Sequence, residues 1–383
     1  MLIYVDNNAT TAVDPQVVDA MMPFLTEQYG NPSSMHAFGG NVGAAIERAR
    51  EQVAKCLGAE YPSEIVFTSC GTESDNTAIR SALRTAKNRK RLVTTRVEHP
   101  AILTLARHLE REGYTVTYLP VDKNGMLSLK QLREKMGDDV AVVSVMSANN
   151  ETGVIFPIDE IGAIAHEHGA VFHTDAVQSM GKVPIDLRSG TIDMLSISGH
   201  KVHAPKGIGA LYVRKGNRFR PFILGGHQER GRRGGTEPVP GIVALGEAAE
   251  LASKHMSDEQ GRVRGLRDRL ETELLKIPGS RVNGHKKKRL PGTCNISFKN
   301  VEGEALLLML DQKGICASSG SACTSGTLEP SHVLRAMGIP FHYAHGSLRL
   351  SLGRMNDDAD VDNIIEALPP IIERLREISP FKD

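Results

Sequence analysis

The stretch Ser198–Gly209, S-G-H-K-V-H-A-P-K-G-I-G, places Lys201 directly after a histidine and between two apolar runs. The runs Met194-Leu-Ser-Ile197 and Ile208-Gly-Ala-Leu-Tyr-Val213 each predict a short strand. The glycines, serine and proline between them predict a tight loop with little charge. A solvated lysine usually lies on a polar helix face, so this placement makes Lys201 a candidate for covalent chemistry.

Lys201 can act as a nucleophile only if its surroundings lower its pKa. At the ordinary lysine pKa only about 0.04% of the amine is neutral at pH 7. A desolvated site favours the neutral amine, which forms imines with aldehydes. The alternative is a lysine at a turn with no chemical role. This stretch alone favours neither interpretation, and the rest of the chain decides between them.

Length and composition predict a soluble globular protein with no large electrostatic partner. The chain has 383 residues, which indicates two to three domains, with 40% hydrophobic and 24% charged residues. A net charge of +1 gives no overall attraction to nucleic acid or to an acidic membrane. The first residues lack a signal-peptide pattern, and no apolar run is long enough to span a bilayer. We therefore expect a cytoplasmic protein that binds neither nucleic acid nor membrane.

The cysteines indicate neither a disulfide framework nor a metal site. Their number is odd and no C-x-x-C pair occurs among Cys56, Cys70, Cys294, Cys316 and Cys323. Cys323 differs from the others because it lies in the flexible pattern S-S-G-S-A-C-T-S-G at 318–326, which has almost no hydrophobic cover. An accessible lone thiol of this kind is either a liability or a reagent.

Short apolar runs alternate with helical patterns along the first two thirds of the chain. This alternation predicts an α/β fold with a mostly parallel sheet covered on both faces. The predicted strands are 65–68, 91–95, 115–121, 140–146 and 171–174; the predicted helices are 15–27, 36–57, 70–86, 99–112, one opening at Ser128, and 158–168.

The remaining third of the chain predicts a smaller α+β domain. Residues 241–275 are mostly helical and lead out of the sheet domain; 302–312 is a second helix, and 293–298 and 347–352 are strands. A last helical pattern spans 361–375, where Pro369 and Pro370 should kink or split the helix. We expect a large domain over 15–255 and a small domain that joins 1–14 to 256–383, with a mobile cysteine loop at about 316–330.

Polar residues follow five of the predicted strands, at the positions where parallel sheets bind ligands. They are Gly71 and Thr72; Glu98, His99 and Pro100; Asn149, Asn150 and Glu151; Asp175 and Gln178; and Ser198, His200 and Lys201. One polar loop would be unremarkable, but five in register predict a single site.

The chemistry of these groups matches pyridoxal 5'-phosphate (PLP). Gly71 and Thr72 at a helix N-terminus offer N–H groups and a hydroxyl to a phosphate. Asp175 can pair with a protonated ring nitrogen, and Lys201 can form an imine with an aldehyde. Neither a G-x-x-x-x-G-K-[ST] nor a G-x-G-x-x-G pattern supports a nucleotide instead.

Motifs spread over nearly the whole chain resemble the class V aminotransferases, and within them the NifS/IscS-type cysteine desulfurases. They are D-N-N-A-T-T (6–11), G-N-P-S-S (30–34), T-S-C-G-T-E-S-D-N (68–76), V-E-H-P-A (97–101), N-N-E-T-G (149–153), H-T-D-A-V-Q (173–178), S-G-H-K (198–201), S-S-G-S-A-C (318–323) and S-L-R-L-S-L-G-R (347–354). The stretch H-Q-E-R-G-R-R-G-G-T-E at 227–237 is closest to the nitrogen-fixation NifS branch.

The resemblance implies the PLP-dependent fold type I of aspartate aminotransferase, with a role for each matching residue. Lys201 would carry the cofactor and move the Cα proton, and His99 would stack on the ring and assist proton transfer. Asp175 would hold the ring nitrogen and Gln178 the ring hydroxyl. The phosphate would bind Gly71, Thr72, Ser198, His200 and Thr236, the last from a partner subunit. Asn150 would lie beside the ring near the substrate, and Arg349 would bind the substrate carboxylate.

The implied activity is conversion of L-cysteine to L-alanine, with sulfur passing as a persulfide on Cys323 to an acceptor. The thiolate of Cys323 is the nucleophile and would need a neighbouring base or cation, for which His99 is the family candidate. The implied partners are a second copy of the chain and a NifU/IscU-type scaffold for iron–sulfur cluster assembly, with nitrogenase as the implied destination.

Other interpretations remain open from the sequence. A selenocysteine lyase or a transaminase would share the PLP site, whereas a catalytically idle sulfur carrier would have no need of both Lys201 and Cys323. Arg349 could form a structural ion pair, and Cys70 fits packing better than chemistry. The basic run Lys286–Arg289 is typical of a solvated turn, with a docking patch for an acidic partner as the alternative.

Overall fold

The protein is built around a seven-stranded sheet in the order β2-β8-β7-β6-β5-β3-β4. The computed structural model describes residues 2–319 and 330–379. The strands are β2 (Ile65–Thr68), β3 (Arg91–Thr95), β4 (Thr115–Leu119), β5 (Val140–Ser144), β6 (Val171–Asp175), β7 (Met194–Ser198) and β8 (Gly209–Val213). β8 is antiparallel to both of its neighbours, and the other six strands run in one direction. The carboxyl ends of these six strands therefore share one edge, as the predicted fold class requires.

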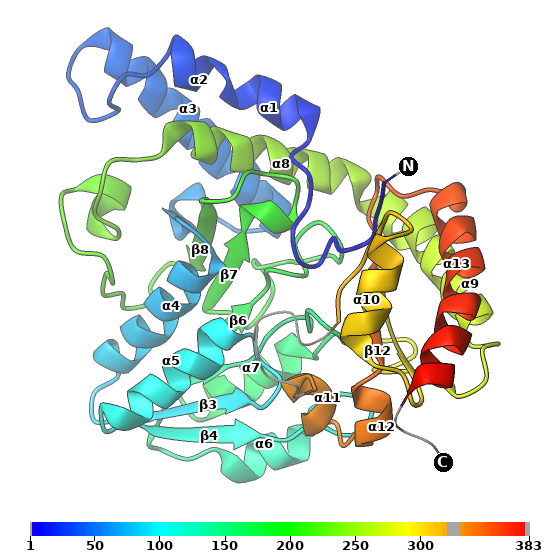
Figure 1. The fold of residues 1–383 in the computed structure, drawn as a ribbon. Helices are drawn as coiled ribbons and strands as arrows, with labels where there is room; N and C mark the ends of the chain where they lie inside the picture. The colour runs from blue at the N-terminus through cyan, green and yellow to red at the C-terminus, as the bar shows by residue number, and fades with distance from the viewer. Residues whose placement is uncertain (1, 320–329, 380–383) are drawn as a thin grey trace.

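Helices cover both faces of this sheet (Figure 1). One face carries α4 (Gly71–Thr85) and α5 (Pro100–Arg111), whose apolar side chains pack with Val66, Leu92 and Met194. The opposite face carries α3 (Ala37–Leu57), α6 (Leu129–Lys135), α7 (Ile158–Glu167) and α8 (Val239–Asp258). Successive residues of one strand point to opposite faces, which explains why every residue of β5, β7 and β8 is buried.

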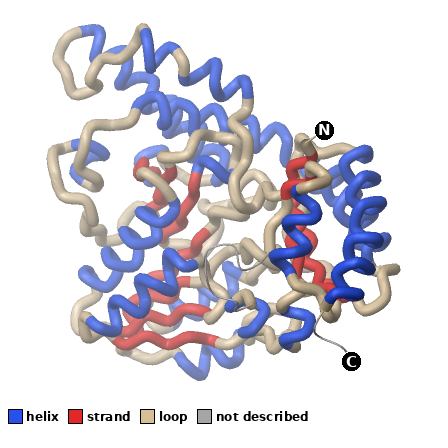
Figure 2. Tube along the Cα trace, in the orientation of Figure 1, coloured by secondary structure: helices blue, strands red, loops and turns tan. Residues whose placement is uncertain are grey.

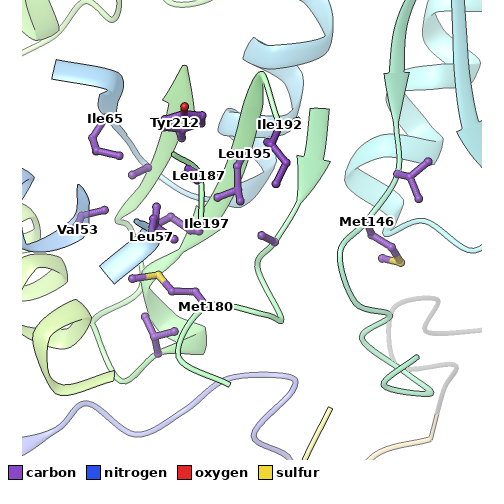
Figure 3. Packing of buried hydrophobic residues seen from close by; sticks show 14 of the residues in the cluster. Val53, Leu57, Ile65, Met146, Met180, Leu187, Ile192, Leu195, Ile197 and Tyr212 are labelled. Atoms are coloured by element: carbon purple, nitrogen blue, oxygen red, sulfur yellow. The ribbon is translucent and has the colours of Figure 1, made fainter. Parts of the chain in front are cut away.

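Figure 3 shows part of the larger core, on the α3 and α8 side of the sheet. Val53 and Leu57 of α3 and Leu195 and Ile197 of β7 belong to this core, with Tyr212 among its largest fully buried side chains. This packing fixes β7 and β8, the two strands that flank the turn at Lys201.

A second cluster of buried apolar residues combines the two ends of the chain. It contains Ile3 and Val5 together with residues from Val263 to Leu375. Its strands are β1 (Ile3–Tyr4), β9 (Ser280–Val282), β10 (Thr293–Phe298), β11 (Ile315–Cys316) and β12 (Ser347–Ser351), and its helices are α9 (Arg264–Leu274), α10 (Gly303–Asp311) and α13 (Asp358–Ile378). Figure 2 shows these elements gathered beside the large sheet. β1 pairs in parallel with β11, and β10 lies between β12 and β9 in an antiparallel sheet.

Two connections join the clusters. The helix α8 continues through a π-helical turn (Glu259–Val263) into α9. One continuous helical segment therefore connects the first core to the second. The short helices α11 (His332–Ala336) and α12 (Phe341–Ala344) contribute Val333, Leu334 and Ala344 to the first core, although they lie within the second cluster in sequence. We propose two domains on these two cores, with α11 and α12 as a bridge between them.

Two helices differ from the sequence-based prediction at a proline: one is interrupted where a continuous helix is expected, and one is continuous where an interruption is expected. The helix expected over 15–27 is divided at Pro23 into α1 (Pro15–Met21) and α2 (Pro23–Thr26), because proline has no amide to donate to the preceding turn. The last helix, in contrast, continues through Pro369 and Pro370 without a break. Buried side chains on both sides of this pair pack into one core, which holds the two halves in line.

Other boundaries were predicted well from capping residues. The long helix α3 begins after His36, whose ring accepts a hydrogen bond from the amide of Gly39, and ends at Gly58 in a left-handed conformation. Ser128 accepts from the amide of Gln131 at the start of α6, as its capping pattern predicted. Among the described residues, no helix is long and apolar enough to cross a membrane.

Candidate active site

A cavity of about 810 Å³ opens at the shared carboxyl edge of the six strands. Its walls combine the segments after β2, β3, β5, β6 and β7 with Arg349 of β12 and with Asn8 and Ala9 of the N-terminal segment. The site thus draws on both hydrophobic clusters. The predicted site residues that line it are Gly71, Thr72, His99, Asn150, Asp175, Gln178, Ser198, His200, Lys201 and Arg349.

Two predicted site residues are not in this lining. Thr236 is exposed in the loop before α8. Cys323 lies outside the described residues. The segments that flank it are described, however, and Pro330, Ser331 and His332 line the cavity. Cys70, which was interpreted as packing, also lines the cavity.

The N-terminus of α4 lines the cavity and provides a cradle for a phosphate. Cys70 is the N-cap residue, yet its side chain makes no capping hydrogen bond, so the first amides of the helix face the cavity unoccupied by a cap. A Cβ atom on Gly71 would lie 2.8 Å from Cγ2 of Val177. Only glycine therefore fits between the helix and the segment after β6. Glu73 in the first turn is engaged elsewhere, because Arg233 donates to its carboxylate at 2.9 Å.

Asp175 ends β6 and is buried, with its Oδ1 accepting a hydrogen bond from the amide of Val177 at 2.9 Å. Burial raises the pKa of Asp175 to about 6. Asp75 lies behind it, and its buried Oδ1 accepts no hydrogen bond among the described residues. Burial, followed by the charge of Asp175, raises the pKa of Asp75 well above its ordinary value. In the part of the chain that the structure describes, neither carboxyl group forms an ion pair with a lysine or an arginine, and together they provide a site for a protonated ring nitrogen.

The amine of Lys201 lies in a cage of backbone oxygens. Its Nζ donates to the carbonyl oxygens of Asn8 at 2.7 Å and Ala9 at 2.6 Å. Burial, followed by the positive charges of Lys182 and Arg349, lowers the pKa of Lys201 to about 8. About half of the amine is therefore neutral at pH 8, which is the condition that imine chemistry requires.

Two of the three histidines that line the cavity, His99 and His200, are neutral near pH 7. Burial and the charge of Lys201 lower the pKa of His99, and likewise that of His200, to about 4. The ring of His99 caps α5, because its Nδ1 accepts from the amide of Ala101 at 3.1 Å. The neutral ring therefore carries its proton on Nε2, and His99 presents a donor to the cavity. This geometry favours a hydrogen-bond donor over a base that collects a proton.

Arg349 is buried and has one donor to spare. Its Nη2 donates to Oδ1 of Asp6 at 2.7 Å and its Nη1 to the carbonyl oxygen of Asn150 at 3.1 Å. Its Nε is buried without a hydrogen-bond partner among the described residues. The ion pair with Asp6 matches the structural alternative for Arg349, while the unused Nε and the position on the cavity wall leave it able to bind a carboxylate.

Sequence reasoning assigned no role to the N-terminal segment at this site. Asp6, Asn8 and Ala9 supply a counter-ion to Arg349 and the acceptors of Lys201. The available signal was the polar motif after the first strand, which was noted only as part of a resemblance. Backbone carbonyl groups leave no trace in the side-chain pattern, so their role could not be read from residue types. Among the described residues, no group of three or more potential ligands could hold a metal ion.

A parallel sheet with a phosphate cradle, a buried carboxylate and a desolvated lysine at its carboxyl edge defines a PLP-dependent enzyme of fold type I. The chain matches the model of the aminotransferase class-V family over residues 3–364. It is 61% identical to a cysteine desulfurase of Trichormus azollae, with 100% of this chain and 96% of the relative covered. It is 58% identical to the cysteine desulfurase NifS of Azotobacter vinelandii, with 99% and 94% covered.

Comparison of the fold with solved structures identifies the same family as the sequence comparisons do. A solved structure of a NifS-like protein superimposes with a TM-score of 0.92 at 39% identity, with 98% of this chain and 100% of that chain covered. The chain belongs to the class V aminotransferase family, and within it to the NifS-type cysteine desulfurases.

Proposed function

We propose that this enzyme removes sulfur from L-cysteine, leaves L-alanine, and carries the sulfur as a persulfide on Cys323. The observation that carries the proposal is the convergence of Lys201, Asp175 and Arg349 on one cavity. These residues provide an amine for the cofactor aldehyde, a carboxylate for the protonated ring nitrogen and a cation for the substrate carboxylate. PLP, when bound, supplies an electron sink that stabilises charge at the substrate Cα after proton loss.

Each residue of the chain then has a task that follows from its contacts. Gly71, Thr72, Ser198 and His200 would hold the phosphate, and Gln178 would donate to the ring hydroxyl oxygen. Asn150 would lie beside the ring. Lys201 would take the Cα proton and return protons to Cα and to the carbon that loses sulfur, the second of them replacing the proton that the Cys323 thiol gives up. Because the pKa of Lys201 is about 8, it can serve as base and then as acid near neutral pH.

The sulfur step belongs to Cys323. Its thiolate would attack the sulfur of the bound cysteine, an S–S bond would form, and the electrons of the broken C–S bond would go to the carbon that becomes the methyl group of alanine. The overall change is L-cysteine plus enzyme thiol giving L-alanine plus enzyme persulfide, which needs no external oxidant. The N–H on Nε2 of His99 would donate a hydrogen bond to the thiol group and would favour a thiolate over a thiol, since Nδ1 is already engaged as an acceptor.

The described ends of the Cys323 segment support this role. Ser318 pairs with the backbone of Arg349, and Ser331 lines the cavity and donates a hydrogen bond to Glu151. Both described flanks of this segment therefore contact residues of the site.

We further propose a homodimer in the cytoplasm. Exposed apolar side chains gather in residues 18–38, where Val18, Met22, Leu25, Tyr29 and Met35 are all accessible. A patch of this kind is typical of a surface that a partner covers. Thr236, exposed and absent from its own cavity, would then complete the phosphate site of the other subunit. The expected sulfur acceptor is a NifU/IscU-type scaffold for iron–sulfur cluster assembly, with nitrogenase as its destination.

A product assay separates this function from its rivals. The purified enzyme should be yellow and should release alanine and, with a thiol reductant, sulfide in equal amounts from L-cysteine. Selenide released from selenocysteine much faster than sulfide from cysteine would favour a selenocysteine lyase, and keto-acid formation would favour a transaminase. A protein without a PLP absorbance band would favour an idle carrier.

A further inference from the structure

Lys182 is a cation that stands directly behind the cavity and outside its lining. It lies in the turn after β6, and its Nζ donates to Oε1 of Gln178 at 3.2 Å and to Oδ1 of Asn8 at 3.3 Å. Both recipients line the cavity. Lys182 therefore acts on the site through its neighbours and not by contact with a ligand.

These contacts determine which way the amide of Gln178 points. A lysine ammonium only donates, so the group that faces it must be the amide oxygen. The amide nitrogen then faces the other way, where it donates to the backbone oxygen of Asn8 at 2.9 Å. Its second N–H is left for the cavity. Any ligand atom that meets Gln178 must consequently be an acceptor.

The same contacts hold the oxygen cage of Lys201. The side-chain oxygen of Asn8 accepts a hydrogen bond from Lys182. Its backbone oxygen accepts hydrogen bonds from both Gln178 and Lys201. The amines of Lys182 and Lys201 thus both donate hydrogen bonds to Asn8. One of them lines the cavity and the other does not.

We propose that Lys182 is a positioning residue of this enzyme: it orients Gln178 as a donor toward the ring oxygen of PLP and keeps the amine of Lys201 neutral by its charge. This rests on the proposed function only for the identity of the ligand. Neutralising a nucleophilic lysine with an adjacent cation is a recognised way of activating it.

The charges around both amines agree with this direction. Burial is the largest cause of the lowered pKa of Lys201, and Lys182 is the next; Arg349 acts in the same sense, while Asp6 and Asp175 act against it. Lys182 itself has a pKa lowered to about 8 by burial, with Glu259 of the π-helical turn acting against that effect and Arg349 with it. The neutral rings of His99 and His200 add no charge near pH 7.

The first test measures Lys201 in the full chain freed of PLP, so that it does not depend on turnover. Competitive acetylation between pH 6 and 10, read by mass spectrometry of the Lys201 peptide, gives the pH midpoint of its reactivity. In Lys182→Met and Lys182→Gln the midpoint should rise by roughly 0.5–1 pH unit, as expected from the loss of one nearby unit charge. At pH 7 the labelling of Lys201 should then slow by about three- to tenfold.

Two variants serve as controls for this measurement. Lys182→Arg keeps the positive charge over the whole pH range and should not raise the midpoint. Lys206→Met removes an exposed positive charge in the loop after Lys201 and should leave the midpoint unchanged. A midpoint in both Lys182→Met and Lys182→Gln that coincides with the wild-type value would overturn the electrostatic role. If Lys182→Met does not fold, Lys182→Gln alone decides, because it retains a hydrogen-bond donor.

The second test concerns the orientation of Gln178 and uses PLP binding by equilibrium dialysis. Lys182→Met should weaken PLP binding, whereas in a Gln178→Leu background the same change should have a much smaller effect, since there is no amide left to orient. Equal weakening in both backgrounds would contradict the positioning role. A wild-type enzyme that binds PLP but makes no alanine from cysteine would defeat the proposed function and leave both of these results intact.

Discussion

Ser318 and Arg349 exchange two backbone hydrogen bonds, from the amide of Ser318 at 3.2 Å and from the amide of Arg349 at 2.6 Å. The chain that enters residues 320–329 therefore leaves from beside the strand that carries the guanidinium group of Arg349. In the proposed mechanism this connects the group that binds the substrate carboxylate with the segment that removes the substrate sulfur. A shift of β12 would move both.

Arg349→Ala should weaken the binding of L-cysteine. A buried, charged hydrogen-bonded pair contributes about 1.5–3 kcal/mol, which corresponds to about 10- to 150-fold in affinity. The measurement is a titration of the cofactor absorbance with cysteine. PLP itself should stay bound, and Asp6→Asn, which removes only the counter-ion, should leave cysteine binding intact or tighter. Unchanged affinity in Arg349→Ala would assign the residue to its ion pair with Asp6 alone.

Cys323→Ala should stop alanine production without preventing substrate binding. Lys201 and the cofactor perform the Cα chemistry, so cysteine should still shift the absorbance spectrum. In the wild type, brief exposure to cysteine without reductant should add about 32 Da, the mass of one sulfur atom, to the Cys323 peptide, in line with the reactivity of an accessible thiolate. Cys70→Ala is a matched control that should retain this increment. An increment on Cys70 or Cys316, or normal turnover by Cys323→Ala, would refute the assignment.

Lys201 should be the site of covalent attachment of PLP. Borohydride should fix the cofactor on the peptide that contains Lys201, and Lys201→Ala should bind PLP reversibly and form no alanine. Peptide mapping distinguishes this lysine from Lys206, five residues away in the same loop, and from Lys182. Cofactor attached to either of those peptides would show that another lysine binds PLP and would refute the assignment of Lys201.

Asp175 should make cofactor binding depend on pH in the acid range. Its pKa in the free protein is about 6, so below pH 6 it carries a proton that must be lost before it can pair with a protonated ring nitrogen. The affinity gained from Asp175 should therefore fall by roughly tenfold per pH unit below 6. The affinity is measured with pyridoxine 5'-phosphate, which lacks the aldehyde and so forms no imine with Lys201. The same measurement on Asp175→Asn shows how much of the pH dependence comes from titration of the ligand phosphate. A constant ratio of wild-type to Asp175→Asn affinities between pH 5 and 7 would contradict this role.

Gly71→Ala should damage the phosphate cradle. Its new Cβ would lie 2.8 Å from Val177, and relief of such overpacking typically costs about 1–3 kcal/mol. We expect weaker PLP binding by dialysis together with a lower melting temperature. Gly40→Ala is the matched control, because outside its own helix backbone no described residue has a heavy atom within 4 Å of the Cβ position there. If both variants bind PLP as the wild type does, the cradle is wider than the structure indicates.

The fold and most of the site could be predicted because the signal lay in side chains. Apolar runs of strand length and polar residues directly after them place Asp175 and Lys201 at one edge of a parallel sheet, whatever the details of packing. Arg349 came from the resemblance. The oxygen cage of Lys201 could not be predicted, because it is made of backbone groups from a segment about 190 residues away. The unbroken helix at Pro369 depends on tertiary packing that outweighs local preference.

The N-terminal segment packs against β11 and β12, which are synthesised much later than it is. Ile3 pairs with Ile315, and the side chain of Asn7 donates to the carbonyl oxygen of Ser351 at 2.9 Å. During synthesis at about 5–20 residues per second, the N-terminal segment emerges from the ribosome on the order of 20–70 s before its partners. The sheet domain can form in that interval, but the acceptors of Lys201 cannot be fixed. Cofactor binding that relies on these acceptors is thereby postponed until residues 315–351 have been synthesised.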